Sequence, residues 1–175
     1  MHQRTWAKST VFVPLVAILS VGAAPSAADS VSGLITRTYV IVEDTDLTGD
    51  VTCDVTGAPC FSFGAPGVEL RLNGFTITGK ADPVTACAGA ALTANEGGIL
   101  TNNQNRVAVR GPGLVQRFRQ HGVWVAGSQD VRVENLTAST NCGSGVFIAA
   151  NAFGTLVEGI TSVRNGSAAA QCGGV

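Results

Sequence analysis

The sequence predicts an all-β solenoid in which short parallel strands stack on one another, and three observations support this fold class. Similar segments recur at an offset of 24, which links Val109, Val133 and Val157, and a second strand recurs at an offset of 23, which links Val123 and Val146. Val131 and Val133 alternate with charged neighbours, as in a half-buried strand, and no segment shows a helical period. Glycine accounts for 22 of 175 residues and charged residues for 13%, against a usual ~7% and ~25%. Such a turn-rich β unit cannot bury its apolar face alone, so it must stack on its neighbours.

Residues 1–28 have the layout of a secretory signal peptide. Two basic residues precede the apolar stretch 11–24, and the small residues Ser26 and Ala28 stand before the expected cleavage site. Fourteen apolar residues are too few to cross a hydrocarbon core of about 30 Å. We therefore expect a secreted or periplasmic protein with no membrane span in the mature chain.

The rest of the chain divides into an N-terminal cap and a series of coils. Residues 29–63 are expected to form the cap or first coil, and residues 64–175 the β-helix coils. A Gly/Ala-rich stretch near 80–98 interrupts the repeat and is expected to be an inserted loop that carries Cys87.

The repeat predicts which residues point inward. Residues one repeat apart lie above one another at the strand spacing of about 4.8 Å. The expected inward ladders are Val109, Val133 and Val157; Pro112, Leu136 and Ile160; and Val123 with Val146. Asn141 and Asn165, one repeat apart, are expected at a turn, where an Asn side chain bonds to the backbone.

Five cysteines follow the expected leader, and export permits disulfides. Stacking of neighbouring coils would bring Cys142 and Cys172 close enough for a bridge. Cys53 and Cys60 are candidates for closing a local loop. Because the count is odd, Cys87 is left over or competes for either pair.

Three segments resemble a known family. They are LRLNGFTITG at 70–79, GVWV at 122–125 and GVFI at 145–148. Over roughly residues 34–175 the chain resembles bacterial right-handed parallel β-helix repeat proteins of the pectate-lyase-like superfamily, as a short or truncated member. The resemblance implies a right-handed parallel β-helix of about five to six coils. It leaves the activity open, since the superfamily contains lyases, hydrolases, epimerases, adhesins and non-catalytic proteins.

Trp124 and Phe147 are candidate carbohydrate-binding residues. Their neighbours in each strand take the inward phase, so the two aromatic rings are expected on the outer face, one coil apart. Exposed aromatic rings offer flat apolar faces on which sugar rings pack. The alternative is that both rings are ordinary surface packing.

Arg117, Arg119 and His121 are further candidates, because they cluster in one turn. We expect this turn to lie beside three other arginines in neighbouring strands, Arg106, Arg110 and Arg132. Arginine binds carboxylates in a bidentate manner, as an acidic polysaccharide requires. The alternative is a solvated turn with surface ion pairs, such as Arg110 with Glu134.

No catalytic set can be assigned. The resemblance implies acidic residues on calcium with an Arg or Lys base in lyases, and a group of aspartates in hydrolases, and neither set maps onto this chain. Glu134 and Glu158 are expected to stack as an exposed ladder. The sequence therefore favours an exported non-catalytic scaffold that contacts polysaccharide and uses no metal or cofactor.

Two other functions are compatible with the sequence. One is a polysaccharide lyase or hydrolase, or a fragment of one, for which calcium would be a cofactor. The other is a surface protein that self-associates end to end or adheres, because the last coil is expected to be uncapped. Nucleic acid is an unsuitable partner, since no polybasic block follows the expected leader.

Overall fold

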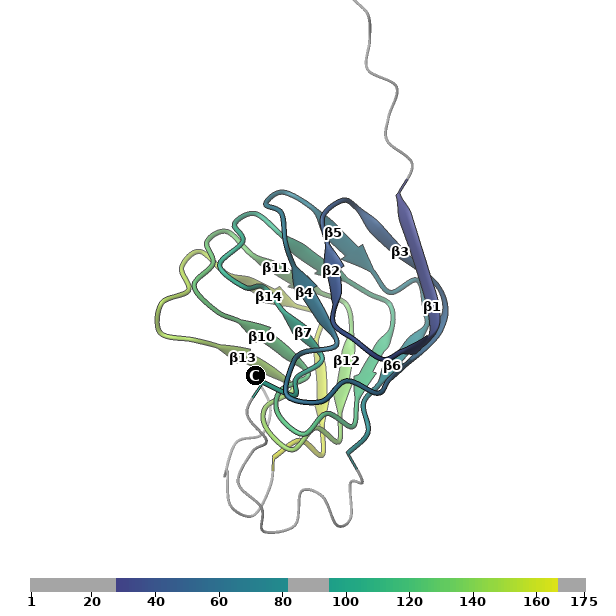
Figure 1. The fold of residues 1–175 in the computed structure, drawn as a ribbon. Coiled ribbons are helices and arrows are strands. Elements are labelled where there is room, and N and C mark those ends of the chain that lie inside the picture. The colour runs from purple at the N-terminus through teal and green to yellow at the C-terminus, as the bar shows by residue number, and fades with distance from the viewer. Residues whose placement is uncertain (1–27, 82–94, 167–175) are drawn as a thin grey trace, which may run out of the picture.

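A computed structural model describes residues 28–81 and 95–166 (Figure 1). The expected leader up to residue 27, most of the expected inserted loop, and Cys87 and Cys172 lie outside these ranges. Every element in the described ranges is a strand. The strands are β1 (Asp29–Ile35), β2 (Tyr39–Ile41), β3 (Thr45–Cys53), β4 (Phe61–Phe63), β5 (Glu69–Arg71), β6 (Thr76–Thr78), β7 (Ile99–Leu100), β8 (Ala108–Arg110), β9 (Leu114–Gln116), β10 (Val123–Val125), β11 (Arg132–Glu134), β12 (Thr137–Ser139), β13 (Val146–Ile148), β14 (Leu156–Glu158) and β15 (Thr161–Val163).

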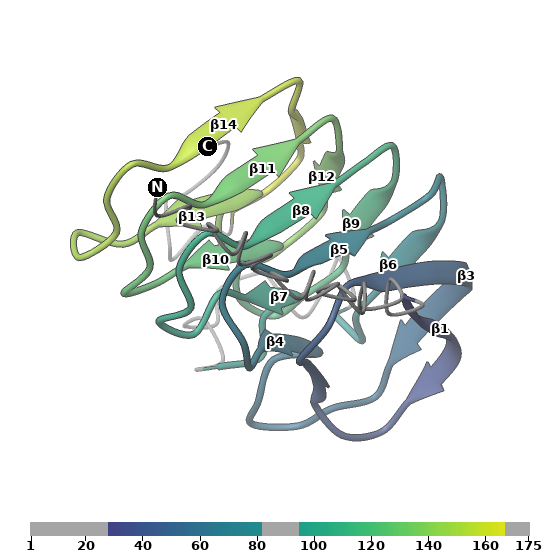
Figure 2. The ribbon, with the colours of Figure 1, turned by 90° about the horizontal axis from the view of Figure 1, so that it is seen from above.

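The strands form two curled sheets in which every pairing is parallel. The ten-stranded sheet has the order β14-β11-β8-β5-β3-β6-β9-β12-β15, with β1 paired to β3, and the five-stranded sheet has the order β13-β10-β7-β4-β2. Figure 2 shows successive turns of the chain stacked from β1 and β3 at one end to β14 at the other. The expected all-β fold with parallel strands is confirmed, and the arrangement is consistent with a parallel β-solenoid.

Strand β3 joins two arms of the ten-stranded sheet. Its first residues, Thr45 and Asp46, pair with β5, and Val51 and Thr52 near its end pair with β6. Strands β5, β8, β11 and β14 therefore form one arm, and β6, β9, β12 and β15 form the other. Each later turn of the chain adds one short strand to each arm and one to the five-stranded sheet.

The spacing of the repeat is confirmed in the strand register. Val109 pairs with Val133, and Val133 with Val157, while Val123 pairs with Val146. Val109, Val123, Val133 and Val146 are fully buried, as expected. Complete burial of a valine contributes roughly 1.5–3 kcal/mol to folding. Val157 is only half-buried, because it belongs to β14, which pairs within the described ranges on one side alone.

The expected ladder through Pro112 is wrong. Leu136 is buried, but Pro112 is exposed. Three residues connect β8 to β9, whereas only Asn135 and Leu136 connect β11 to β12. The offset between paired residues is consequently one smaller at Leu114–Thr137 than at Arg110–Glu134. The additional residue moves Pro112 out of line with Leu136.

Left-handed backbone marks one corner of each turn. The residue two positions before β5, β8, β11 and β14 has a positive φ in every case; these residues are Gly67, Arg106, Asp130 and Gly154. Only two of the four are glycines, although an L residue adopts this conformation at a cost. The stacked corner sharply redirects the chain into the first arm of the ten-stranded sheet.

Asn141 bonds to the backbone, as expected, and is fully buried. Its Oδ1 accepts from the N–H of Phe118, and its Nδ2 donates to the carbonyl of Val115 and to Oδ1 of Asn165. The positive φ belongs to the preceding residues, Thr140 and Arg164, and not to the asparagines.

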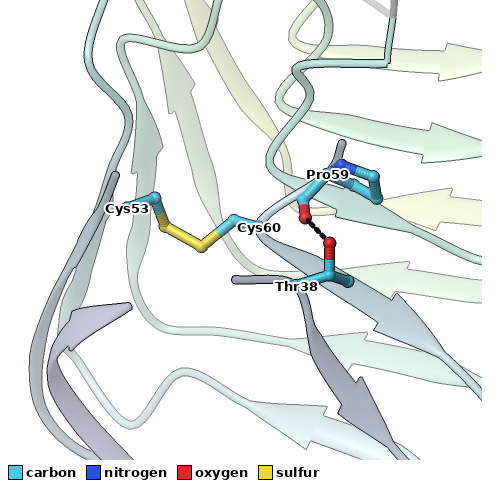
Figure 3. The surroundings of a disulfide bond; sticks show 4 residues. All are labelled: Thr38, Cys53, Pro59 and Cys60. Atoms are coloured by element: carbon cyan, nitrogen blue, oxygen red, sulfur yellow. Dashed lines mark hydrogen bonds between the residues drawn. A yellow bond between two sulfur atoms is a disulfide. The ribbon is translucent and has the colours of Figure 1, made fainter. Parts of the chain in front are cut away.

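A disulfide joins Cys53, at the end of β3, to Cys60, just before β4 (Figure 3). The Cα atoms are 5.8 Å apart and the bridge closes the loop that contains Pro59, whose carbonyl accepts from Thr38 Oγ1 at 2.7 Å. Cys142 is also disulfide-bonded. Its expected partner, Cys172, lies outside the described residues. No helix in the described part of the chain could span a membrane.

Candidate functional site

One column of side chains crosses the outer face of the five-stranded sheet. Hydrogen-bonded register places its members on successive strands: Val40, Ser62, Leu100, Trp124 and Phe147. Trp124 stands between Val123 and Val125, which are fully buried, so its side chain points away from the core. Trp124 and Phe147 are half-buried.

His121 completes an aromatic cluster with Trp124 and Phe147. Its ring stacks on Phe147 with 4.3 Å between centroids and an interplanar angle of 10°, and it meets Trp124 edge-on at 5.7 Å. The centroids of Trp124 and Phe147 are 6.3 Å apart. Each such contact is worth about 0.5–1.5 kcal/mol beyond the area it buries. The three rings therefore hold one another in place.

His121 is neutral at pH 7. It is 5% exposed, and burial lowers its pKa from 6.5 to about 4. Its Nδ1 accepts from the backbone N–H of Ser144 at 3.0 Å, so the proton of the neutral ring is on Nε2. The imidazole of this cluster therefore carries no positive charge at pH 7.

A largely apolar pocket of about 210 Å³ lies beside Trp124. Gly57, Ala58 and Pro59, from the disulfide-closed loop, form one wall, and Gly97 and Leu100 form another. The loop is also held by Glu96, whose Oε1 accepts from the N–H of Gly57 at 2.9 Å. The Cys53–Cys60 bridge therefore supports a wall of this pocket. The repeat gave no sign of it, because one wall comes from the loop of Gly57, Ala58 and Pro59, which lies outside the repeat.

Arg117 and Arg119 are engaged elsewhere. Nε of Arg117 donates to the carbonyl of Ala81 at 3.0 Å, and Nη1 of Arg119 lies 3.3 Å from Oε2 of Glu96. Because Glu96 is 6% exposed and also holds Gly57, Arg119 supports the pocket wall through it. These two arginines and His121 follow one another in the chain but contact different partners.

Two of the other three arginines, Arg110 and Arg132, lie on strands of the ten-stranded sheet, and Arg106 lies at the corner before β8. Arg106, Arg110 and Arg132 line a groove of about 540 Å³, together with Asp44, Glu69 and Asp130. Ala108, the short residue between Glu69 and Arg132 in register, forms its floor. The structure therefore separates two arginine groups that the sequence analysis expected side by side.

Ion pairs cross this second surface in an alternating chain. Arg71 pairs with Glu69, Glu69 with Arg110, Arg110 with Glu134, and Glu134 with Arg132. The expected Arg110–Glu134 pair is thus confirmed. Burial raises the pKa of Glu69, but hydrogen bonds from Arg110 and Arg71 outweigh it and hold that pKa below the usual value. Glu158 pairs in register with Glu134, as expected, but the expected exposed ladder is wrong at Glu134, which is 6% exposed because Arg110 and Arg132 cover its carboxylate.

The carboxylates of Glu69 and Glu134 are engaged on both oxygens by arginines. A carboxylate so engaged is a poor general base, because its lone pairs already accept charge-assisted bonds. In the ten-stranded sheet these two glutamates therefore link neighbouring strands through ion pairs.

Comparison with known proteins adds no relative to this description. No family model, no curated protein and no solved structure matches the chain.

Proposed function

We propose that this protein is an exported, non-catalytic scaffold that contacts polysaccharide through the outer face of the five-stranded sheet. In this proposal the fold is a right-handed parallel β-helix of the pectate-lyase-like superfamily. The parallel stacking of successive repeats supports the fold, and the Cys53–Cys60 disulfide is compatible with an extracellular location.

The observation that carries the binding proposal is the outward column Leu100, Trp124 and Phe147 on three adjacent parallel strands. Adjacent strands are about 4.8 Å apart, so the column forms a continuous apolar strip. Sugar rings pack their C–H faces on aromatic rings, while their hydroxyls remain available for polar contacts. His121 stacks on Phe147 and holds its ring in place within this strip.

Affinity electrophoresis in gels that contain different polysaccharides tests this function. Trp124→Ala and Phe147→Ala are expected to abolish retardation by the bound polysaccharide. Phe153→Ala is the matched control, because Phe153 is an exposed aromatic residue (63%) outside the column. Equal retardation of the wild type and both column variants in every gel overturns the proposal.

The two alternative functions, a polysaccharide lyase or hydrolase and a self-associating surface protein, remain predictions. A lyase or hydrolase would release unsaturated or reducing ends from its polymer, and an assay for such ends distinguishes it from a binding protein. Self-association would appear as a size that grows with protein concentration. We favour the scaffold because the carboxylates of Glu69 and Glu134 are held by arginines.

A further inference from the structure

The groove of about 540 Å³ on the ten-stranded sheet opens over a short side chain. Ala108, on the outer face of β8, lies in register between Glu69 on β5 and Arg132 on β11. Arg110 follows on the same face of β8, and Arg106 stands at the corner before this strand. Three guanidinium groups and one carboxylate therefore border the space above Ala108.

Most of the acidic side chains in this groove are paired with arginine. Oε1 and Oε2 of Glu69 accept from Arg71 and Arg110, and Asp44 pairs with Arg71 as well. Asp130 is exposed at the corner before β11 and forms no ion pair with any residue that the structure describes. Asp130 is therefore the acid of this groove that no described cation neutralises.

The arginines keep donors that no described residue uses. Arg106 is exposed, and its guanidinium bonds to no side chain or carbonyl within residues 28–81 and 95–166. The side chain of Arg132 is 55% exposed, and its bond to a described residue is made by Nη1, to Glu134. Arg110 donates from Nε and Nη1, which leaves Nη2. Since each guanidinium has five N–H donors, the groove offers more donors than its own carboxylates accept.

We propose that this groove binds a tetrahedral oxyanion, a sulfate or phosphate ester carried by a polysaccharide. Such an ester has three terminal oxygens that point in different directions and accept hydrogen bonds. Arg106 and Arg110 flank Ala108 along the chain, and Arg132 lies on the adjacent strand, so each would donate to a different oxygen. Charge-assisted bonds of this kind are roughly twice as strong as neutral ones.

A carboxylate or a cation matches the groove less well. A carboxylate is planar and is satisfied by the two parallel donors of a single guanidinium, so it would leave two of the three arginines uncommitted. A cation would meet three guanidinium groups and would gain Asp130 as its unpaired carboxylate. The uncommitted donors on three arginines therefore favour the tetrahedral ester.

This inference goes beyond the proposed function, because the groove lies on the other sheet from Trp124 and Phe147. It rests on the proposed function only for the class of polymer. Binding by the groove is expected to be unchanged in Trp124→Ala, so the two proposals can fail separately.

Calorimetric titration of the full chain with size-matched dextran oligomers tests the inference. Four oligomers differ only in their substituent: a sulfate ester, a phosphate ester, a carboxymethyl group at matched total charge, and none. We expect sulfated or phosphorylated dextran to bind at least tenfold more tightly than carboxymethyl dextran, and the tighter of the two identifies the ester. That affinity should fall as salt rises, because salt screens exposed charges. Equal affinity for the three charged oligomers, or no binding of any, overturns the inference.

Arg106→Asn tests a guanidinium that no described residue engages. Asparagine tolerates the left-handed backbone of this corner, and the substitution breaks no ion pair in the described chain. We expect about tenfold weaker binding of the preferred ester. Arg37→Gln, at an exposed arginine outside the groove, is the matched control and should retain the affinity. Weakening of equal size in both variants would show that only net charge matters, and it would overturn the inference.

Two further variants separate shape from charge. Ala108→Leu fills the space in the groove while every charge stays in place, and it is expected to abolish binding of the ester. Asp130→Asn removes the unpaired acid and is expected to strengthen binding roughly two- to fivefold, the range of an exposed charge pair. Urea midpoints equal to that of the wild type show that each variant is folded. Unchanged affinity in folded Ala108→Leu or folded Arg106→Asn overturns the inference.

Discussion

The imidazole of His121 lies flat on the ring of Phe147, with 4.3 Å between centroids, while its Nδ1 accepts from the N–H of Ser144. The bond to Ser144 requires the neutral ring. A proton on Nδ1 would remove the acceptor and would place a charge in a buried site. The aromatic surface is therefore coupled to pH.

We predict that stability falls between pH 6.5 and pH 4. Burial holds the pKa of His121 at about 4 in the folded protein, against 6.5 in the unfolded chain. The unfolded state therefore binds more protons in this window, so the contribution is complete above pH 6.5 and is lost as pH falls. The expected loss is about 2 kcal/mol.

The pKa itself is measured by NMR titration, in which His2 is the only other histidine. Denaturant unfolding at pH 7 and pH 4.5 gives the stability change. His121→Phe should flatten the dependence in this window. A measured pKa of 6 or above for His121 contradicts the prediction.

Removal of the Cys53–Cys60 bridge should affect stability and binding together. For a loop this short, closure in the unfolded state accounts for about 2–3 kcal/mol. The pair of changes Cys53→Ala and Cys60→Ala is expected to lower the free energy of unfolding by that amount. It should also weaken binding of the glycan, because Ala58 and Pro59 form a pocket wall within the loop. Unchanged urea midpoint and affinity would show that the bridge supports neither.

Asn141→Ala should be among the most destabilising polar substitutions in the described chain. It leaves the N–H of Phe118 and the carbonyl of Val115 without the bonds that Asn141 supplies in a fully buried site. The expected cost is about 2–4 kcal/mol. Asn151→Ala is the matched control, since Asn151 is exposed and accepts one bond, from Gly127. Equal unfolding midpoints for the two variants would contradict the assigned role.

Glu69→Gln should destabilise the protein in a manner that depends on pH. Since Arg110 and Arg71 hold the pKa of Glu69 below its usual value, its contribution is present above pH 4.5 and is lost as pH falls further. We expect a cost of about 1 kcal/mol at pH 7 that shrinks at pH 3 and at high salt. Glu158→Gln, at an exposed position of β14, is the control. A cost for Glu69→Gln that is independent of pH would show that the charge is not what matters.

The sequence predicted the parts of the fold that depend on periodicity. Val109, Val133 and Val157 are in register, and so are Trp124 and Phe147, because identical spacing in a solenoid means identical position. The predicted inward position of Pro112 was wrong because the connection from β8 to β9 has one residue more than the connection from β11 to β12. The additional residue moves the side chain of Pro112 out of the column that contains Leu136. Such a change is visible only when both connections are compared in space.

The positions of the arginines could not be predicted in this way. Arg106 and Arg117 both have left-handed backbone, with φ of 57° and 59°. This conformation is uncommon for a residue other than glycine, asparagine or aspartate, so nothing in the residue type signals it. The chain direction changes at each such corner, and the two arginines consequently line different surfaces. The pocket beside Trp124 escaped prediction because one of its walls comes from the loop of Gly57, Ala58 and Pro59, which lies outside the repeat.

The nine-residue strand β3 has a consequence for folding order. It pairs with β1 at both ends, with a register shift between them, and with the first strand of each arm, β5 and β6. Since side chains alternate with a period of two, a slip of one residue in β3 would reverse the inward and outward faces of both arms together. This single strand therefore acts as the template from which both arms take their phase, and we expect assembly to proceed from it one turn at a time towards β14 and β15.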